Sequence, residues 1–405
     1  MSAIAAYRAL LRIVGPAYVV VAFLGRIPLA MSQLGVLVLV STETGRYGVG
    51  GAAAGILAVA NAIGSPLAGA LADRVGQRPV VLVQSLVGAV GLVAVVLVTG
   101  AGAAHGIIFL AAGITGFAMP QVGPLARVRW RPITSDRGDQ RRLVDAAFSY
   151  EGAADEASFV LGPALIGVLA IVAEPAGALV AAAVLLAVFG TWFAVHPTSA
   201  LVAKRAATDV VGGSTLWTVS FVVLVFAQLC IGAIFGSVQT GTTVLADGVG
   251  QAGAAGLIHA VLGIGSVIAG LAVTALPERV LYATRMLVAA TGLLVLSAPL
   301  LLVDSILSLV VVIALLGFAV APYMISNFAL AGILVPLHRV GTAMTLLAGA
   351  TGIGYALGAS LAGRLADDSG HRPAFAVTVA AAGVALVLAL AANRTLREAR
   401  PVAHA

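Results

Sequence analysis

The sequence predicts an all-α membrane protein whose twelve transmembrane helices form two pseudo-symmetric bundles of six. The 405 residues are 61% hydrophobic and only 9% charged, with a mean hydropathy of +1.10, whereas about a quarter of the residues in a soluble domain are charged. Apolar runs of about 20 residues, enough to cross a hydrocarbon core of about 30 Å, recur along the whole chain. Two pairs of segments also repeat about half a chain apart, which indicates an internal duplication.

The apolar runs define the expected spans. They are continuous rather than alternating, and unpaired strand edges cannot face lipid, so each run is expected to be a helix. Together they leave no room for a soluble domain. The spans are expected at residues 16–41, 48–72, 78–99, 104–126, 145–172, 176–195, 216–242, 252–275, 280–303, 305–335, 341–365 and 373–392.

The basic residues predict how these spans are oriented. With the N-terminus inside, eighteen of the 22 Lys and Arg residues fall in cytoplasmic loops and tails, three fall outside, and Arg26 lies within the first span. Such an excess of basic residues is typical of cytoplasmic loops. We therefore expect a multi-pass protein of a bacterial-type inner membrane with both termini in the cytoplasm.

The densest basic segment is "RVRWRPITSDRGDQRR", residues 127–142. We interpret it as an orientation signal that touches lipid headgroups rather than as a nucleic acid site. Trp130, Trp192 and Trp217 fall at predicted helix ends, where amphipathic rings lie at the membrane interface. The sequence contains no metal cluster, nucleophile triad or phosphate-binding loop, so neither an enzyme activity nor a metal or cofactor is expected.

The internal repeat relates the two halves of the chain. Residues 53–69 and 254–270 share eight residues at a shift of 201, and "LGPALIGVLA" from 161 agrees with "LGASLAGRLA" from 357 at six of ten positions. Each shift spans six helices, an even number, so both halves are expected to have the same orientation in the membrane.

A polar stretch divides the repeats. It covers residues 196–215 and is the longest polar segment without a span. We therefore expect an N-terminal six-helix bundle at residues 1–195, a cytoplasmic linker at 196–215 and a C-terminal six-helix bundle at 216–405.

The loop between the second and third spans reads "GALADRVGQRP", residues 69–79. It resembles the signature of the major facilitator superfamily, in which Gly-x-x-x-Asp-Arg-x-Gly precedes paired basic residues, and it lies in the loop where that family carries it. Gln77 stands where the first paired basic residue is usual. The matching residues are Gly69, Asp73, Arg74, Gly76 and Arg78.

This resemblance implies a transporter in which the loop latches the two halves on the cytoplasmic side. It implies that Asp73 lies near the start of the eleventh span, around Gly341. A carboxylate is favoured at a helix N-terminus by free amide groups and the helix dipole. Arg74 and Arg78 are expected to pair with acids or lipid headgroups. The repeat places Thr274 at the position of Asp73 in the second half.

Three carboxylates lie within the fifth span, in "SYEGAADEASFVLGP", residues 149–163. An ionised Asp at the bilayer centre costs about 2.5–3.5 kcal/mol on insertion scales, so Glu151, Asp155 and Glu156 are not expected to face lipid. Asp155 and Glu156 follow Arg142 by 13 and 14 residues, and Arg26 follows Arg12 by 14. At 1.5 Å per residue, Arg26 and both acids lie about 20 Å from their basic anchors, at one depth.

The spacing of the acids gives each an expected direction. Glu151 and Asp155 are four residues apart and share one stripe, whereas Glu156 is turned by about 100° from Asp155. One of Asp155 and Glu156 is expected to meet Arg26 while the other reaches elsewhere. Because acids outnumber cations at this depth, at least one carboxyl is expected to carry a proton near neutral pH. Two interpretations remain open: proton coupling or substrate binding, and a fixed link between the first and fifth helices.

The fifth span also contains "SFVLGPALIG", which resembles the Gly-Pro signature of drug/proton antiporters at Gly162, Pro163 and Gly167, although Ser158 and Ile166 replace expected glycines. The resemblance implies a functional monomer in the lipid bilayer that couples H+ to efflux of a small amphipathic molecule. One alternative is a permease that takes up an organic anion or metabolite, with Arg26 as its charge clamp. A second is a membrane receptor or scaffold that does not transport.

Overall fold

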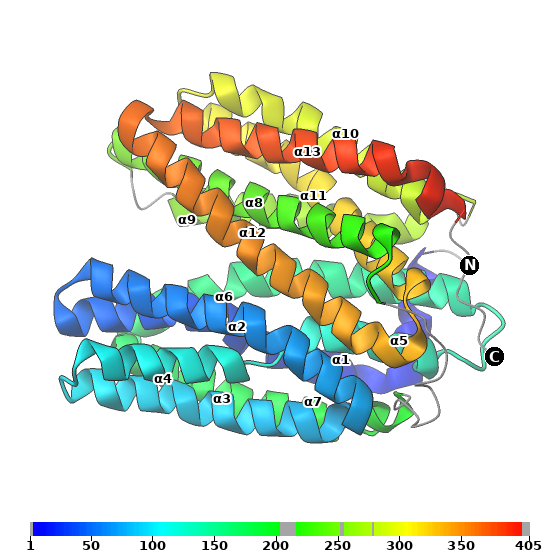
Figure 1. The fold of residues 1–405 in the computed structure, drawn as a ribbon, viewed down its shortest axis with the longest axis horizontal. Helices are drawn as coiled ribbons and strands as arrows, with labels where there is room; N and C mark the ends of the chain where they lie inside the picture. Colours follow the sequence, from blue (N-terminus) through cyan, green and yellow to red (C-terminus); the bar gives the residue numbers. More distant parts are fainter. Residues whose placement is uncertain (1–2, 203–215, 252–254, 278, 399–405) are drawn as a thin grey trace.

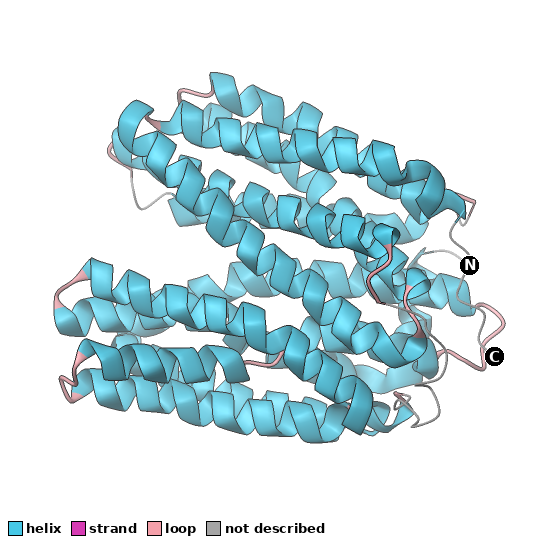
Figure 2. Cartoon of the chain, in the orientation of Figure 1, coloured by secondary structure: helices cyan, strands magenta, loops and turns pink. Residues whose placement is uncertain are grey.

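The computed structural model describes residues 3–202, 216–251, 255–277 and 279–398, and all regular structure within these ranges is helical (Figure 2). The helices fall into two groups that follow the two halves of the sequence (Figure 1). The predicted all-α membrane fold is therefore confirmed. Residues 203–215 of the predicted linker lie outside the described residues, and the boundaries of the two predicted bundles stay a prediction.

The first half contains seven α-helices and two short helices of other types. They are α1 (Ala3–Thr44), α2 (Tyr47–Val75), α3 (Gln77–Gly100), α4 (His105–Ala118), α5 (Val122–Ile133), α6 (Gln140–Leu185), a π-helix (Leu186–Gly190), α7 (Thr191–Val195) and a 3-10 helix (Pro197–Leu201).

The second half contains six described α-helices and three described 3-10 helices. They are α8 (Val219–Gly248), α9 (Ala255–Ala272), a 3-10 helix (Val273–Ala275), α10 (Tyr282–Ser297), a 3-10 helix (Ala298–Leu302), α11 (Ile306–Leu334), a 3-10 helix (Leu337–Arg339), α12 (Val340–Ser369) and α13 (His371–Glu398).

Eleven helical stretches of the described chain are long and apolar enough to cross a membrane. The stretch Gln140–Val195 has 56 residues, which is about 84 Å at 1.5 Å per residue and more than twice the thickness of a bilayer core. Its backbone leaves the helical conformation at Ala173 and at Glu174, where φ is 60°. Pro175 has no amide hydrogen and disfavours helix at the preceding residue. This stretch therefore holds both the fifth and the sixth predicted spans, which accounts for the twelve.

One predicted boundary is wrong and another needs an addition. The predicted start at residue 16 coincides with a non-helical break at Gly15, where φ is 75°, and a further helical segment precedes it from Ala3. The fourth span continues as α5 to Ile133 rather than ending at residue 126. In both places the helix carries arginines beyond its apolar run. Hydropathy locates the part of a helix that crosses lipid and does not locate its end.

The fourth span is interrupted at Pro120, between α4 and α5. The side-chain amide of Asn61 in α2 donates to the carbonyl oxygens of Gly116 (3.1 Å) and Met119 (3.0 Å). These bonds provide donors for carbonyls near the break, so an irregular backbone is tolerated at membrane depth. The break lets α5 follow a different path from α4 toward the centre of the molecule.

The start of α1 and the end of α13 lie at the same end of the molecule, here called the terminal end (Figure 1). The ribbons of the two halves meet near this end and diverge toward the opposite end. Contacts between the halves run mainly from α2 to α12 and from α6 to α9. Helices α6 and α12 thus place residues of each half against the other.

Glycines set the distance between α8 and α12 inside the second half. A Cβ on Gly354 of α12 would meet the backbone carbonyl of Leu229, whereas a Cβ on Gly352 would meet nothing within 4 Å. Replacement of Gly354 by Ala is therefore expected to lower the free energy of unfolding by about 1–3 kcal/mol, because the two backbones must separate.

The matched control is Gly352→Ala, on the same helix, which is expected to change that free energy by less than about 1 kcal/mol. Unfolding of both variants in mixed micelles with increasing dodecyl sulfate measures the difference. Equal destabilisation by the two substitutions would show that close approach of α8 and α12 does not determine stability here.

Candidate functional site

A buried ion-pair network links α1, α5 and α6. Arg26 of α1 is only 4% exposed, and its Nη2 lies 2.5 Å from Oε2 of Glu151 while its Nη1 lies 2.8 Å from Oδ1 of Asp155. Its Nε donates to the carbonyl oxygen of Ala22, one turn earlier (3.0 Å). All three nitrogens of the guanidinium are therefore engaged.

Asp155 is shared between two arginines. Its second oxygen, Oδ2, accepts a bond from Nη1 of Arg127 in α5 at 2.7 Å. A Cβ on Gly123 would meet this carboxylate, so the glycine provides the space in which Asp155 lies beside α5. The second oxygen of Glu151, Oε1, accepts from the indole nitrogen of Trp130, also in α5 (2.8 Å). Both carboxylates thus have charge-assisted partners on two helices.

Glu156 lies on a different face of α6, against α9 of the other half. On α9, a Cβ at Gly263 would meet Val160, and one at Gly270 would meet the backbone of Ala153. Residues 153, 156 and 160 share one helical stripe, so Glu156 lies within the contact between the halves. Its carboxyl faces the hydroxyl of Ser266 on α9.

Glu156 is 7% exposed, and the structure gives it no ion pair with any described residue. The charged side chains that act on it most strongly are Asp155 and Arg127. The described network therefore sets three carboxyls, two buried and one partly exposed, against two buried guanidiniums. An ionised carboxylate without a partner is costly away from water, so Glu156 differs in kind from Glu151 and Asp155.

The predicted level of Arg26 and the acids is confirmed by these contacts. Asp155 meets Arg26, and Glu156 reaches elsewhere, as the 100° turn between them predicts. Glu151 joins the same cation, in agreement with the stripe that it shares with Asp155. The predicted direct link between the first and fifth spans is present, as a contact between α1 and α6. The role of Arg26 and the three acids in coupling stays a prediction.

The interpretation of the basic segment as headgroup contacts is wrong for its first residues. Arg127, Arg129 and Trp130 are at most 1% exposed, because α5 continues through them into the protein. Sequence reasoning missed Arg127 as a site residue. A signal was present, since Arg127 and Trp130 are three residues apart and share a face, as do the Glu151 and Asp155 that they contact. Trp192 and Trp217 are 46% and 61% exposed, as predicted for interfacial rings.

Arg129 anchors the loop that carries the family-like motif. Its Nε donates to Oε1 of Gln77 (2.8 Å), its Nη1 donates to the carbonyl of Phe193 (2.9 Å), and its guanidinium lies over the Phe193 ring. Gln77 departs from the expected basic residue, and the structure supplies a reason, because a cation at position 77 would oppose Arg129. Burial and the charge of Arg129 lower the pKa of His196, so this imidazole stays neutral beside the cation at neutral pH.

Asp73 binds the N-terminus of α12, as predicted. Its carboxylate accepts the backbone amides of Gly341 (3.0 Å) and Thr342 (2.8 Å) and the hydroxyl of Thr342 (2.6 Å). A Cβ on Gly69 would meet Thr345 and the Gly341 carbonyl. The first half is thus joined to the second at the terminal end by a carboxylate at a helix N-terminus, where the dipole favours it.

The other motif residues have simpler roles. Gly76 separates α2 from α3 with a φ of 96°, a conformation that favours glycine. Arg74 and Arg78 are exposed, and the structure shows no ion pair from either to a described residue. Of the two expected partners, acids and lipid headgroups, only the headgroups remain.

Neutralising Asp73 is expected to weaken closure of the terminal end. Hydrogen bonds to a charged group contribute about 1.5–3 kcal/mol each, and Asp73→Asn loses some of them and retains others. Because 1.4 kcal/mol corresponds to a factor of ten, the ratio of open to closed molecules is expected to rise by about tenfold or more. Spin labels on cysteines at the exposed Arg12 and Arg394, in a Cys230→Ser background, measure the distance between halves. Arg74→Gln is the control, and an unchanged distance distribution in Asp73→Asn would contradict the latch.

Three further contacts join the halves at the terminal end. Asp145 of α6 accepts a hydrogen bond from the Tyr282 hydroxyl and lies 3.5 Å from Nη1 of Arg285. The hydroxyls of Tyr7 and Thr274 are 2.7 Å apart. The position that corresponds to Asp73 in the second half therefore keeps a contact across the halves without a carboxylate.

The Gly-Pro segment of α6 packs against α1. A Cβ on Gly162 would meet Ala30 and the backbone of Met31, whereas one on Gly167 would meet nothing within 4 Å. Pro163 lies inside the continuous helix. Only Gly162 has a packing role that requires glycine. Among the described residues, no group of three or more His, Cys, Asp or Glu side chains could hold a metal ion.

Comparisons with known proteins agree on one family. The sequence model described as Major Facilitator Superfamily matches residues 18–346 and 224–404. The human organic anion transporter MFSD10 (TETRAN) is similar in structure, with a TM-score of 0.73 at 18% identity over 93% of this chain and 99% of that chain. A comparison with curated protein sequences gives no match.

A bacterial homologue of the iron transporter ferroportin is similar in two structures. In its outward-facing state the TM-score is 0.74 at 16% identity, and with soaked iron it is 0.71 at 14% identity. Both alignments cover 92% of this chain and 98% of the other. At these identities the solved structures show the fold alone.

Proposed function

Because the chain belongs to the major facilitator superfamily, and is thus a membrane transporter rather than an enzyme, we propose that it couples inward movement of protons to export of a small amphipathic compound. It acts as a monomer in the inner membrane with the terminal end in the cytoplasm. The bundles of residues 1–195 and 216–405 rock about the contact between α6 and α9, so that a central site opens to one side at a time.

The observation that carries this proposal is the position of Glu156. Its carboxyl is buried between the two halves, without an ion pair among the described residues and beside a network in which Arg26 and Arg127 are already paired. Movement of α6 relative to α9 would separate Glu156 from Ser266 and admit water. A group that is buried in one state and hydrated in another can hold a proton in the first and release it in the second.

The ion-pair network holds α6 in place in the proposed mechanism; its members are Arg26, Glu151, Asp155 and Arg127. It fixes the face of α6 that points into the first half, so that Glu156 points toward the second. Asp73, at the N-terminus of α12, stabilises the state in which the cytoplasmic end is closed. The proton carrier and the latch thus act on the same motion of one half against the other.

The geometry favours this function over uptake with Arg26 as a charge clamp. All three guanidinium nitrogens of Arg26 have protein acceptors, and four of its five N–H donors are used, so that side chain is already committed to protein partners. No contact among the residues that the structure describes favours a scaffold that does not transport.

Flux in two kinds of membrane preparation tests the proposal. Everted vesicles that contain the protein and are acidified inside are expected to accumulate fluorescent amphipathic compounds, and a protonophore is expected to abolish the accumulation. Accumulation in intact cells alone would indicate an importer. The absence of protein-dependent flux in both, across a broad panel of compounds, would contradict transport by proton exchange.

A further inference from the structure

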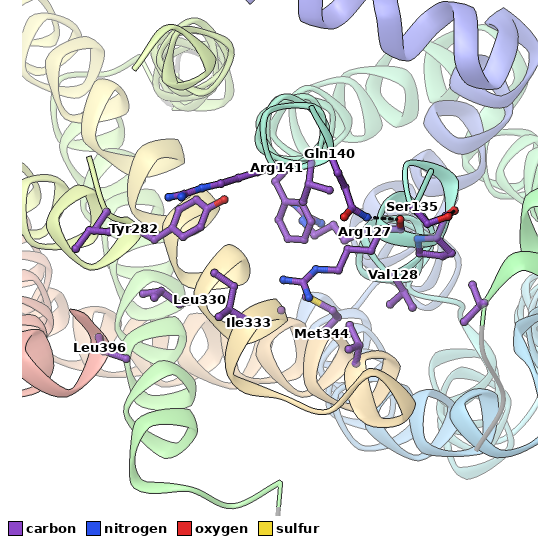
Figure 3. A pocket seen from close by; sticks show the side chains of 18 of the residues that line it. Arg127, Val128, Ser135, Gln140, Arg141, Tyr282, Leu330, Ile333, Met344 and Leu396 are labelled. Carbon is purple, nitrogen blue, oxygen red and sulfur yellow. Dashed lines mark hydrogen bonds between the residues drawn. The ribbon is translucent and has the colours of Figure 1, made fainter. Parts of the chain in front are cut away.

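A cavity of about 750 Å³ lies between the halves at the terminal end (Figure 3). Its walls come from α5 and the start of α6 in the first half and from α10 to α13 in the second. Binding sites for small organic molecules have volumes of about 300–1,000 Å³. The cavity therefore has the size of a ligand site, and residues of both halves line it.

The described charged residues that line this cavity all carry one sign. They are Arg127, Arg131, Arg141 and Arg397, and no carboxylate is among the described lining residues. Apolar side chains such as Phe148, Leu330, Ile333 and Met344 form much of the remaining wall. In Figure 3, Arg141 extends beside the ring of Tyr282, and Leu330, Ile333 and Met344 lie below it. The lining combines positive charge with apolar surface.

Arg127 forms the inner wall and has unused donors. Within the described part of the chain, only its Nη1 has an acceptor, on Asp155; its Nε and Nη2 are buried and have no hydrogen-bond partner there. Its guanidinium lies 4.4 Å from the centre of the Phe328 ring. A guanidinium has five N–H donors and matches the geometry of a carboxylate, sulfonate or phosphate group. These two unpartnered donors are themselves buried, so an acidic group that enters the cavity reaches them once the wall around Arg127 moves.

Arg131 also lines the cavity and is half-buried, so it is more exposed than Arg127. Its Nη2 is close to Gly332 of α11, and the structure shows no ion pair from it to a described residue. An anion held between Arg131 and Arg127 would place its apolar body against the side chains from α11 and α12.

We propose that this cavity binds an organic anion with an apolar body, with the acidic group on Arg127 and Arg131. This deepens the proposed function by giving the substrate class, and its role in transport rests on that function. Binding itself does not depend on transport. The same chemistry is present in a free amphipathic anion and in the headgroup of an anionic phospholipid.

The link to the coupling network follows from the shared arginine. Arg127 binds Asp155 with one nitrogen and lines the cavity with the same guanidinium. An anion that engages Nε and Nη2 of Arg127 would compete with Asp155 for its positive charge. Occupation of the cavity is thereby connected to the carboxylates beside Glu156.

Calorimetric titration of the purified protein in phosphatidylcholine nanodiscs tests the site. The probe is naphthalene-2-sulfonate, and 2-naphthol is the neutral probe with the same ring. The sulfonate is expected to bind saturably and at least tenfold more tightly than 2-naphthol. Arg131→Gln is expected to weaken sulfonate binding at least tenfold, while Arg12→Gln, an exposed arginine outside the cavity, leaves it unchanged.

A second arm identifies the source of the anion. If phosphatidylglycerol in the nanodisc displaces the sulfonate from the wild-type protein, the natural ligand is a lipid headgroup; if it does not, the ligand is a free anion. Equal binding of the two probes by the wild type, which needs no variant to fold, would overturn the proposal, as would equal effects of Arg131→Gln and Arg12→Gln. Sulfonate binding that depends on Arg131, without proton-driven flux, would contradict the proposed function and leave this site intact.

Discussion

Replacement of Arg26 by Met is expected to lower the free energy of unfolding by about 3–5 kcal/mol, because removal of one partner leaves a buried charge without compensation. The charge concerned is that of Glu151, which is 0% exposed and keeps only the Trp130 indole as a side-chain donor. Asp155 would retain Arg127. The loss is measured by unfolding in mixed micelles and as recovery of monodisperse protein.

Two controls separate the loss of a buried ion pair from other effects of the substitution. Arg372→Met breaks the pair with Asp304, in which Nη2 of Arg372 contacts both carboxylate oxygens and the side chains are 56% and 62% exposed; exposed pairs contribute about 0–1 kcal/mol. The double variant Arg26→Met, Glu151→Met removes both buried charges and is expected to be more stable than Arg26→Met alone. If Arg26→Met costs no more than Arg372→Met, the network is not a structural element of this fold.

Replacement of Glu156 by Gln is expected to reduce proton-driven accumulation at least 100-fold while the free energy of unfolding changes by less than about 1 kcal/mol, because Gln has nearly the same shape as Glu and no ion pair is lost. Asp155→Asn, one residue earlier, is expected to cost about 3–5 kcal/mol, because Arg26 and Arg127 share that carboxylate. Thermal unfolding and vesicle flux, measured on both variants, separate the two neighbouring acids. A loss of stability in Glu156→Gln as large as in Asp155→Asn would show that both are structural.

Much of the fold follows from physical constraints that act along the chain. A lipid core requires long apolar helices, so their number and approximate positions could be predicted from the sequence. The turn at Ala173 to Pro175 and the break at Pro120 occur where proline removes a donor. The ends of α1 and α5 could not be predicted, because a helix that leaves the lipid core can continue with charged residues that are buried against protein.

The same limit explains which part of the candidate site was missed. Counting residues from basic anchors placed Arg26 level with Asp155, since depth depends only on the rise of a helix. Positive charge near a span end usually faces the cytoplasm, so the sequence places Arg127 in a loop. Its contact with Asp155 depends on the break at Pro120, after which α5 packs against α6.

The direction in which the Glu156 side chain points could be predicted only in part. Helical geometry predicts that it points away from Asp155, but which helix it meets depends on how the two halves pack. Gly263, Ser266 and Gly270 of α9 provide a signal, because small residues three and four apart let helices approach in a membrane. That signal identifies a packing face and does not name its partner.

Equilibrium exchange of substrate across the membrane, without a proton gradient, tests most directly whether Glu156 is the proton carrier. In proteoliposomes loaded with unlabelled substrate, Glu156→Gln is expected to exchange labelled substrate at a rate within about threefold of wild type, because binding and rocking do not require release of the proton. Under an imposed pH gradient the same proteoliposomes are expected to show no net accumulation. Loss of exchange together with accumulation, in a variant as stable as wild type, would contradict the assignment of Glu156 to coupling.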